Sequence, residues 1–89
     1  MPYTILWNKI AIDSLRKLEK NISERIVIKV RSLVENPYFF LERLSGEKLY
    51  KVRVGDYRIV VEMDEANKKI FIRLAGHRKN VYKILGRIL

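Results

Sequence analysis

The chain has 89 residues, of which 48% are hydrophobic, and a formal net charge of +9 at pH 7. This length suits one domain over residues 1–89, and so high an apolar fraction excludes a disordered segment. The absence of cysteine excludes disulfides and thiolate metal sites. The basic excess predicts an acidic partner: a nucleic acid, a ribosomal surface, an acidic protein or, less well supported, a membrane.

Other classes of protein are also disfavoured by the composition. No apolar run approaches the roughly 20 residues that a membrane-spanning helix needs. No basic segment followed by a long apolar region opens the chain, so we expect no signal peptide and a cytoplasmic protein. With one histidine, scattered acids and four isolated glycines, the sequence predicts no metal site and no small-molecule cofactor.

The first half of the chain predicts a strand followed by two helices. Residues 2–7 are β-prone and suit an edge strand. Asn8 can cap a helix that runs to about Lys20, and Ser23 can cap a second helix that the Asn36–Pro37 pair ends. Two helices joined by so short a connection should form an antiparallel hairpin that covers one face of a sheet.

A β-hairpin is predicted around the dipeptide Gly55-Asp56. Glycine supplies the positive φ of a type II′ turn, and the flanking runs are rich in β-branched and aromatic residues. A two-residue loop places Arg53 directly opposite Arg58, with Lys51 on the same face. Facing like charges weaken a hairpin by up to about 1 kcal/mol. The face is therefore either a solvated basic surface or a preformed site for a polyanion.

The last strand is predicted over residues 70–75. In its simplest register Ile72 lies opposite Ile59, and Arg73 then joins Arg58 on the basic face. A shift of one residue would remove Arg73 from that face, because side chains alternate along a strand.

A short helix is predicted to close the chain after the segment Gly76-His77-Arg78-Lys79-Asn80. Arg78 and Tyr82 are four residues apart, so they can lie side by side on the first turn of this helix. Its apolar stripe is weak.

These residue types suit the chemistry of phosphate and RNA. Arginine binds phosphate bidentately, and tyrosine can stack on a base or move a proton. Because RNA carries its own 2′-hydroxyl nucleophile, a protein that clamps a phosphate and moves protons can cleave it without a metal. A surface that only binds anions is an equal alternative on the residues alone.

The segment Tyr50-Lys51-Val52-Arg53-Val54-Gly55-Asp56-Tyr57-Arg58-Ile59-Val60, with Gly76-His77-Arg78 and Val81-Tyr82, resembles the RelE/ParE superfamily of toxins. The resemblance covers nearly the whole chain. It implies an α+β fold: an N-terminal strand, an antiparallel two-helix hairpin, a mainly antiparallel sheet of about four strands in all, and a short C-terminal helix.

The resemblance to the RelE-like branch also implies a function. Such proteins are toxins of type II toxin–antitoxin systems. They are ribosome-dependent endoribonucleases that cleave mRNA in the A site of the 30S subunit, by attack of the 2′-hydroxyl on the scissile phosphate. The expected partners are the ribosome, mRNA and a cognate acidic antitoxin of the RelB type.

Matching positions carry the implied catalytic roles. Lys51 and Arg53 match the basic residues of the second strand, and Arg58 matches the arginine that holds the scissile phosphate. Arg78 matches the arginine proposed to protonate the leaving 5′-oxygen. Tyr82 matches the tyrosine that stacks against or activates the nucleotide.

One position departs from the family pattern, which has lysine where Arg53 stands. An arginine, with a reference pKa above about 12, cannot act as a base. That role would pass to Lys51 or Tyr82, or the rate would depend mainly on clamping the phosphate.

Further contacts to RNA or phosphate are expected from Arg73, His77 and Lys79. His77 could also relay a proton, although its place at the end of a strand favours a structural or rRNA-contacting role. Two other functions stay open: a non-catalytic, ParE-like inhibitor of DNA gyrase, and an inert or merely RNA-binding relative.

Overall fold

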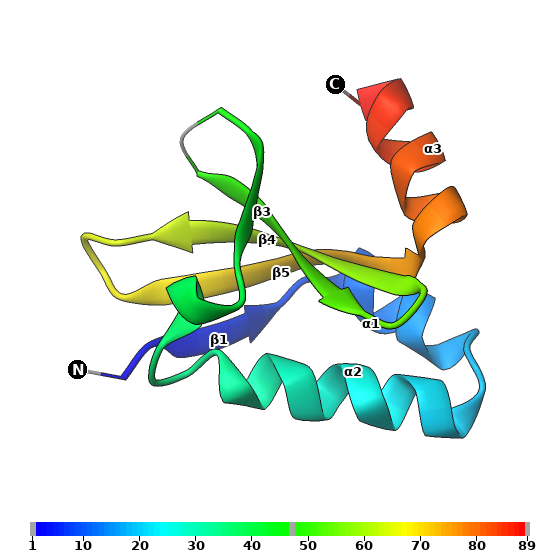
Figure 1. Ribbon diagram of the computed structural model, residues 1–89, viewed down its shortest axis with the longest axis horizontal. Coiled ribbons are helices and arrows are strands. Elements are labelled where there is room, and N and C mark those ends of the chain that lie inside the picture. Colours follow the sequence, from blue (N-terminus) through cyan, green and yellow to red (C-terminus); the bar gives the residue numbers. More distant parts are fainter. Residues whose placement is uncertain (1, 47, 89) are drawn as a thin grey trace.

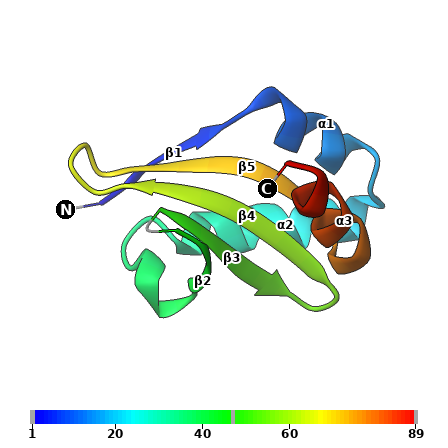
Figure 2. The ribbon, with the colours of Figure 1, turned by 90° about the horizontal axis from the view of Figure 1, so that it is seen from above.

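A five-stranded sheet in the order β1-β5-β4-β3-β2 forms the centre of the protein (Figures 1 and 2). The computed structural model describes residues 2–46 and 48–88. The strands are β1 (Thr4–Trp7), β2 (Glu42–Ser45), β3 (Leu49–Val54), β4 (Tyr57–Asp64) and β5 (Lys69–His77). β1 pairs in parallel with β5, and the other pairs are antiparallel. The predicted α+β class is confirmed, and β2 is a strand that the sequence did not reveal.

Three α-helices and one 3-10 turn accompany the sheet: α1 (Lys9–Arg16), α2 (Lys20–Ser32), η1 (Pro37–Phe39) and α3 (Arg78–Ile88). Asn8 caps α1 as predicted, because its Oδ1 accepts a hydrogen bond of 2.8 Å from the backbone N–H of Ala11. None of the helices in the described part of the chain is long and apolar enough to cross a membrane.

The break between α1 and α2 lies earlier than expected. Glu19, with φ −58° and ψ 146°, is the residue that precedes α2. Ser23 does not cap this helix; it lies inside the first turn and its hydroxyl donates to the carbonyl oxygen of Lys20. The prediction for Ser23 is wrong because α1 already ends at Arg16, which leaves room for α2 to begin sooner.

The β3–β4 hairpin has the predicted register. Val54 pairs with Tyr57, and Arg53 pairs with Arg58 across the two-residue turn. Gly55 has a φ of +59°, the region that favours glycine. Strand alternation and one glycine were thus enough to fix which side chains share a face.

The predicted register between β4 and β5 is wrong. Ile72 pairs with Val61 and not with Ile59, because a bulge leaves Arg73 as an extra residue in β5. The bulge keeps Ile72 in the main core while Leu74 joins a core on the opposite face. Arg73 lies beside Glu62, with Nε 3.5 Å from Oε1.

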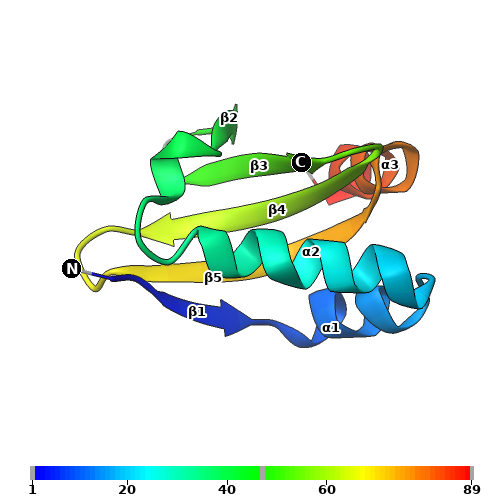
Figure 3. The same ribbon diagram turned by 60° about the horizontal axis from the view of Figure 1, so that its bottom comes forward.

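Apolar side chains pack on both faces of the sheet. The main core lies beneath α1 and α2 (Figure 3), as the helix hairpin predicted, and includes Ala11, Ile26, Val30, Val52, Ile59 and Ile72. A smaller core joins α3 to the other face through Val60, Leu74, Val81 and Leu85. Because α3 stands on this small core at one end of the sheet (Figure 1), its first turn meets the tip of the hairpin.

Candidate active site

Arg58 is nearly buried on the face of the sheet that carries α3. Only 6% of it is exposed. Its Nη1 donates to the carbonyl oxygens of Gly55 and Tyr57, each at 2.9 Å, and its Nε donates to the hydroxyl of Tyr82 at 3.3 Å. Nη2 takes part in none of these bonds. The guanidinium is therefore held in a fixed orientation by the turn and by α3.

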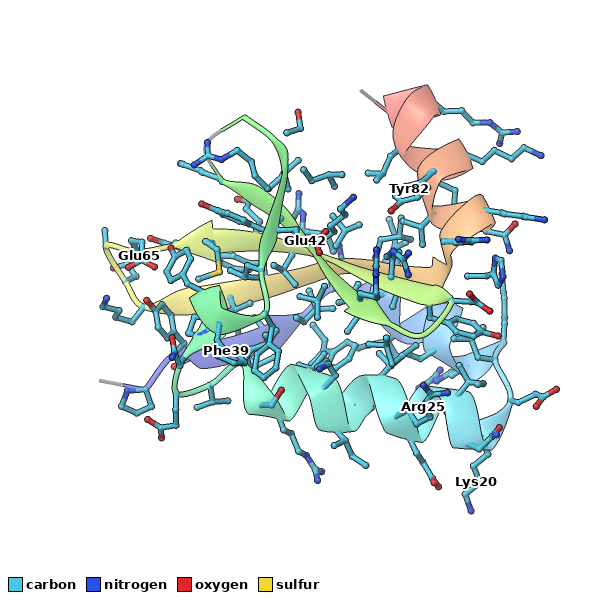
Figure 4. The ribbon with its side chains drawn as sticks, in the orientation of Figure 1. Lys20, Arg25, Phe39, Glu42, Glu65 and Tyr82 are labelled. Atoms are coloured by element: carbon cyan, nitrogen blue, oxygen red, sulfur yellow. The ribbon has the colours of Figure 1, made fainter. Side chains whose placement is uncertain are left out.

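Tyr82 receives a second cation from β3. Lys51 Nζ lies 3.5 Å from the Tyr82 hydroxyl oxygen and 5.6 Å from the centre of its ring. Figure 4 shows Tyr82 extending from α3 toward the strands. Three elements, β3, β4 and α3, thus bring one amine, one guanidinium and one phenol together.

This arrangement changes the acidity of Tyr82. Burial raises the pKa of Tyr82, but the hydrogen bonds from Arg58 and Lys51 and their positive charges outweigh that effect and hold it below its usual value of 10.0. Both cations donate to the same oxygen atom, so each lowers the free energy of the phenolate relative to that of the phenol.

The charge of this cluster of Lys51, Arg58 and Tyr82 is poorly balanced by acids. Within residues 2–46 and 48–88, no carboxylate forms an ion pair with Arg58. Lys51 has a loose and exposed partner, with Nζ 3.9 Å from Glu42 Oε2. A nearly buried charge that contacts only neutral oxygens is costly unless an anion joins it. The cluster therefore suits an anionic ligand.

Arg78 begins α3 beside the hairpin turn that holds Arg58. Its backbone N–H donates to the carbonyl oxygen of Asp56 at 2.9 Å, which fixes the start of α3 to the hairpin turn. The side chain is exposed and lies one helical turn before Tyr82. Arg58 and Arg78 consequently lie at the same end of the molecule.

Arg53 lies at the exposed end of β3. It pairs with Arg58, so its side chain lies by strand alternation on the same face of the sheet as Arg58 and Lys51, and the residue also borders a groove between β3 and α2. Arg25 lies at the same groove, and its Nη2 approaches to 3.1 Å from the place where a Cβ on Gly55 would lie.

The other expected RNA-binding residues are not gathered at the cluster of Lys51, Arg58 and Tyr82. Arg73 is held by Glu62, four residues beyond Arg58 along β4. His77 pairs with Tyr57, whose ring packs edge-on at 5.5 Å, and its Nδ1 accepts a hydrogen bond from the backbone N–H of Lys79. His77 thus ends β5 and supports the first turn of α3. The side chain of Lys79 is exposed.

The chain matches a family model described as the ParE toxin of the type II toxin–antitoxin system parDE, over residues 5–82. That match covers most of the sequence. The chain belongs to this toxin family. No curated protein matches it significantly.

Solved structures resemble the toxin over most of its length. A chain of the RelBE2 toxin–antitoxin complex of Mycobacterium tuberculosis is 26% identical with a TM-score of 0.79, covering 88% of this chain and 100% of the other. A chain of the archaeal RelE–RelB complex of Pyrococcus horikoshii is 27% identical with a TM-score of 0.77, covering 88% and 97%.

A free RelE variant from E. coli shares the fold at lower identity. It is 24% identical, has a TM-score of 0.76, and the match covers 100% of both chains. The RelE-like fold expected from the resemblance is therefore shown for this toxin.

The sequence did not reveal that Glu42 lies near Lys51 or that Arg25 lines the groove between α2 and β3. Glu42 lies on β2, a strand whose pairing depends on the rest of the sheet. Arg25 did have a readable signal, because Arg25, Lys29 and Ser32 follow the i, i+4, i+7 spacing of one helical face. No group of three His, Cys, Asp or Glu side chains that could hold a metal occurs among the described residues.

Proposed function

We propose that this toxin is a ribosome-dependent endoribonuclease that cleaves mRNA in the A site. The observation that carries the proposal is the nearly buried guanidinium of Arg58, which contacts Tyr82 and has neutral oxygens as its partners. Such a group is a preformed receptor for a phosphate, and the phenol beside it can move a proton.

Arg58 clamps the scissile phosphate in this proposal. Its Nη2 group is directed to the non-bridging oxygens, while Nη1 stays bonded to the turn. A fixed donor of this kind stabilises the extra negative charge of a pentacovalent transition state.

Tyr82 is the group that we assign to the 2′-hydroxyl. Its lowered pKa increases the fraction of phenolate available to accept the proton as the 2′-oxygen attacks phosphorus. Lys51 supports this role by donating to the same oxygen. Attack forms the bond from the 2′-oxygen to phosphorus and breaks the bond from phosphorus to the 5′-oxygen. The products are a 2′,3′-cyclic phosphate and a 5′-hydroxyl, whose proton comes from the Arg78 guanidinium, which solvent then reprotonates. We assign Arg78 to that leaving oxygen, because it begins the helix one turn before Tyr82.

An antitoxin is the second expected partner. The similar chains from M. tuberculosis and P. horikoshii come from complexes of toxin with antitoxin. A net charge of +9 favours an acidic antitoxin of the RelB type, whose carboxylates would oppose the basic face.

Mapping of mRNA ends on translating ribosomes tests the proposal. The wild type should produce cuts at A-site codons with 2′,3′-cyclic phosphate ends. The variants Arg58→Ala, Arg78→Ala and Tyr82→Phe should each lower the cleavage rate about 100-fold or more.

Arg87→Ala is the matched control for Arg78→Ala, since both arginines are exposed on α3. Thermal unfolding of each variant separates loss of chemistry from loss of structure, because Arg58 also binds the carbonyls of the turn. Growth arrest by the Arg58→Ala/Arg78→Ala double variant would overturn the catalytic assignment.

Inhibition of DNA gyrase is a second candidate function, favoured by the match to the ParE toxin model. A fold shared by both branches does not choose between them. Loss of supercoiling by purified gyrase, with mRNA left intact on ribosomes, would support this function and contradict the nuclease. If neither loss of supercoiling nor mRNA cleavage is observed, the protein is an inert or merely RNA-binding relative.

A further inference from the structure

A second basic surface lies around the edge of β3 from the proposed active site. It is a groove of about 460 Å³ between α2 and β3. The residues that line it include Arg25, Lys29, Phe40, Arg53 and Gly55. We name it the α2–β3 groove. It contains three cations and no acid, so its chemistry selects an anion.

The cations of the α2–β3 groove come from a helix and a strand. Arg25 and Lys29 are one turn apart on α2, and Arg53 borders the groove at the edge of β3. β2 pairs with Leu49, Tyr50 and Lys51, so no described strand covers the outer edge of β3 from Val52 onward. The groove is therefore open along its length to an extended chain.

Aromatic rings lie at the end of the groove away from the hairpin tip. Lys29 Nζ lies 4.3 Å from the centre of the Phe40 ring, and the ring of Phe39 packs edge-on against Phe40 at 5.0 Å. Phe39 is 77% exposed. Figure 4 shows Arg25 and Phe39 toward opposite ends of α2. Exposed aromatic rings beside a row of cations are the usual means of holding unpaired bases and their phosphates.

Gly55 connects the α2–β3 groove with the proposed active site. Its carbonyl oxygen accepts a hydrogen bond from Arg58, while the Arg25 guanidinium approaches the side where a Cβ would lie. One residue of the turn thus separates the two cationic surfaces. A strand that places a phosphate at Arg58 can continue past the turn into the groove.

We propose that the α2–β3 groove binds the sugar–phosphate backbone of the same RNA strand whose scissile phosphate lies at Arg58. This inference rests on the proposed function for the position of the scissile phosphate. Arg25, Lys29 and Arg53 bind flanking phosphates, and the exposed ring of Phe39 stacks on a base. The groove contributes affinity and register, because phosphate contacts carry no direct sequence information.

The test measures binding of RNA that cannot be cleaved. The probe is a fluorescent 2′-O-methyl RNA long enough to reach both surfaces, and its affinity is measured by anisotropy over a range of salt. The variant Arg25→Gln/Lys29→Gln should weaken binding and reduce the slope of log K against log salt by about 1.4, at about 0.7 per phosphate contact. A dinucleotide, which reaches only Arg58, should bind equally to variant and wild type.

Lys20→Gln/Arg31→Gln is the matched control. It removes the same charge from the same helix at exposed residues that do not line the α2–β3 groove. The conservative variant Arg25→Lys/Lys29→Arg should restore the slope, which a merely structural role for these side chains would not predict. If Lys20→Gln/Arg31→Gln weakens RNA binding and reduces the salt slope as much as Arg25→Gln/Lys29→Gln does, the proposal is overturned.

The same test separates the groove from the proposed nuclease. Because the probe lacks a free 2′-hydroxyl, its binding is independent of cleavage. If the Arg25→Gln/Lys29→Gln variant binds RNA as the wild type does but no longer binds the antitoxin, the groove belongs to a protein partner and the proposal is overturned. Undetectable binding of the long probe to the wild type would also overturn it. Absent mRNA cleavage alongside groove-dependent RNA binding would contradict only the proposed function.

Discussion

Tyr82 is the residue at which the surroundings most clearly change chemistry. The two cations that donate to its oxygen come from positions 24 and 31 residues away in the chain. Each stabilises the phenolate relative to the phenol, and their joint effect exceeds that of burial. A tyrosine in this environment can serve as the base that Arg53 cannot be.

We expect Lys51→Gln to raise the pKa of Tyr82 toward its usual value of 10.0, because it removes one of the two cations that stabilise the phenolate. Titration of the tyrosine ring carbons by NMR measures this. If Tyr82 is the base, the rise of the cleavage rate with pH should move to higher pH in the same variant. Lys83→Gln removes a cation on the α1 side of α3. It should change neither the pKa of Tyr82 nor the pH dependence of the cleavage rate. A Tyr82 pKa that does not respond to Lys51 would contradict the electrostatic account.

The β3–β4 hairpin is the element on which the two basic surfaces depend. Its turn supplies the carbonyl oxygens that hold Arg58, receives the first N–H of α3 at Asp56, and lies against Arg25 of α2. Four elements therefore meet at two turn residues. A change of turn geometry should disturb both surfaces together.

Gly55→Ala should destabilise the protein by about 1–2 kcal/mol, because a φ of +59° is unfavourable for a residue with a Cβ. The new Cβ would also lie 3.1 Å from Arg25 Nη2, so Arg25 would have to move. Urea denaturation measures the change. Gly86→Ala is the control: a Cβ there meets nothing within 4 Å, and alanine is the better helix former. Equal stability of Gly55→Ala and the wild type would show that the turn tolerates an L-residue.

At the scale of the whole molecule, one carboxylate joins three segments of the chain at the end of the sheet opposite α3. Glu65, in the turn after β4, accepts hydrogen bonds from the hydroxyls of Tyr3 and Tyr38 and from Lys68. Figure 4 places Glu65 at the end of the sheet away from Tyr82. The cluster joins the N-terminal segment, η1 and the β4–β5 turn, which are far apart in sequence.

The hydrogen bonds from Tyr38, Tyr3 and Lys68 lower the pKa of Glu65 from 4.5 to about 2. A carboxyl whose folded pKa is depressed stabilises the protein above its unfolded pKa, and this contribution disappears as pH falls through the folded value. The wild type should therefore melt at a higher temperature than Glu65→Gln. This difference in melting temperature should be largest above about pH 5 and should decrease as pH falls toward 2. Glu35→Gln, at an exposed position, should show no such trend. A difference that is constant with pH would contradict the role of Glu65.

The sequence predicted the hairpin well because its determinants are local. A glycine at the turn and strict alternation placed Arg53 opposite Arg58. The same reasoning failed for Arg73, since a bulge is chosen by how Ile72 and Leu74 pack on opposite faces. It also failed for Ser23, because the end of α1 depends on its packing against β5 and not on a cap further along the chain.

By itself, the sequence determined the α+β class, the family resemblance and the facing arginines of the hairpin. Only the tertiary structure decided that α3 rests on the small core around Val60, and that Tyr82 therefore reaches Arg58 and Lys51. The reason is physical: periodicity fixes which face of an element a side chain occupies, whereas contacts between distant elements follow from how those faces pack.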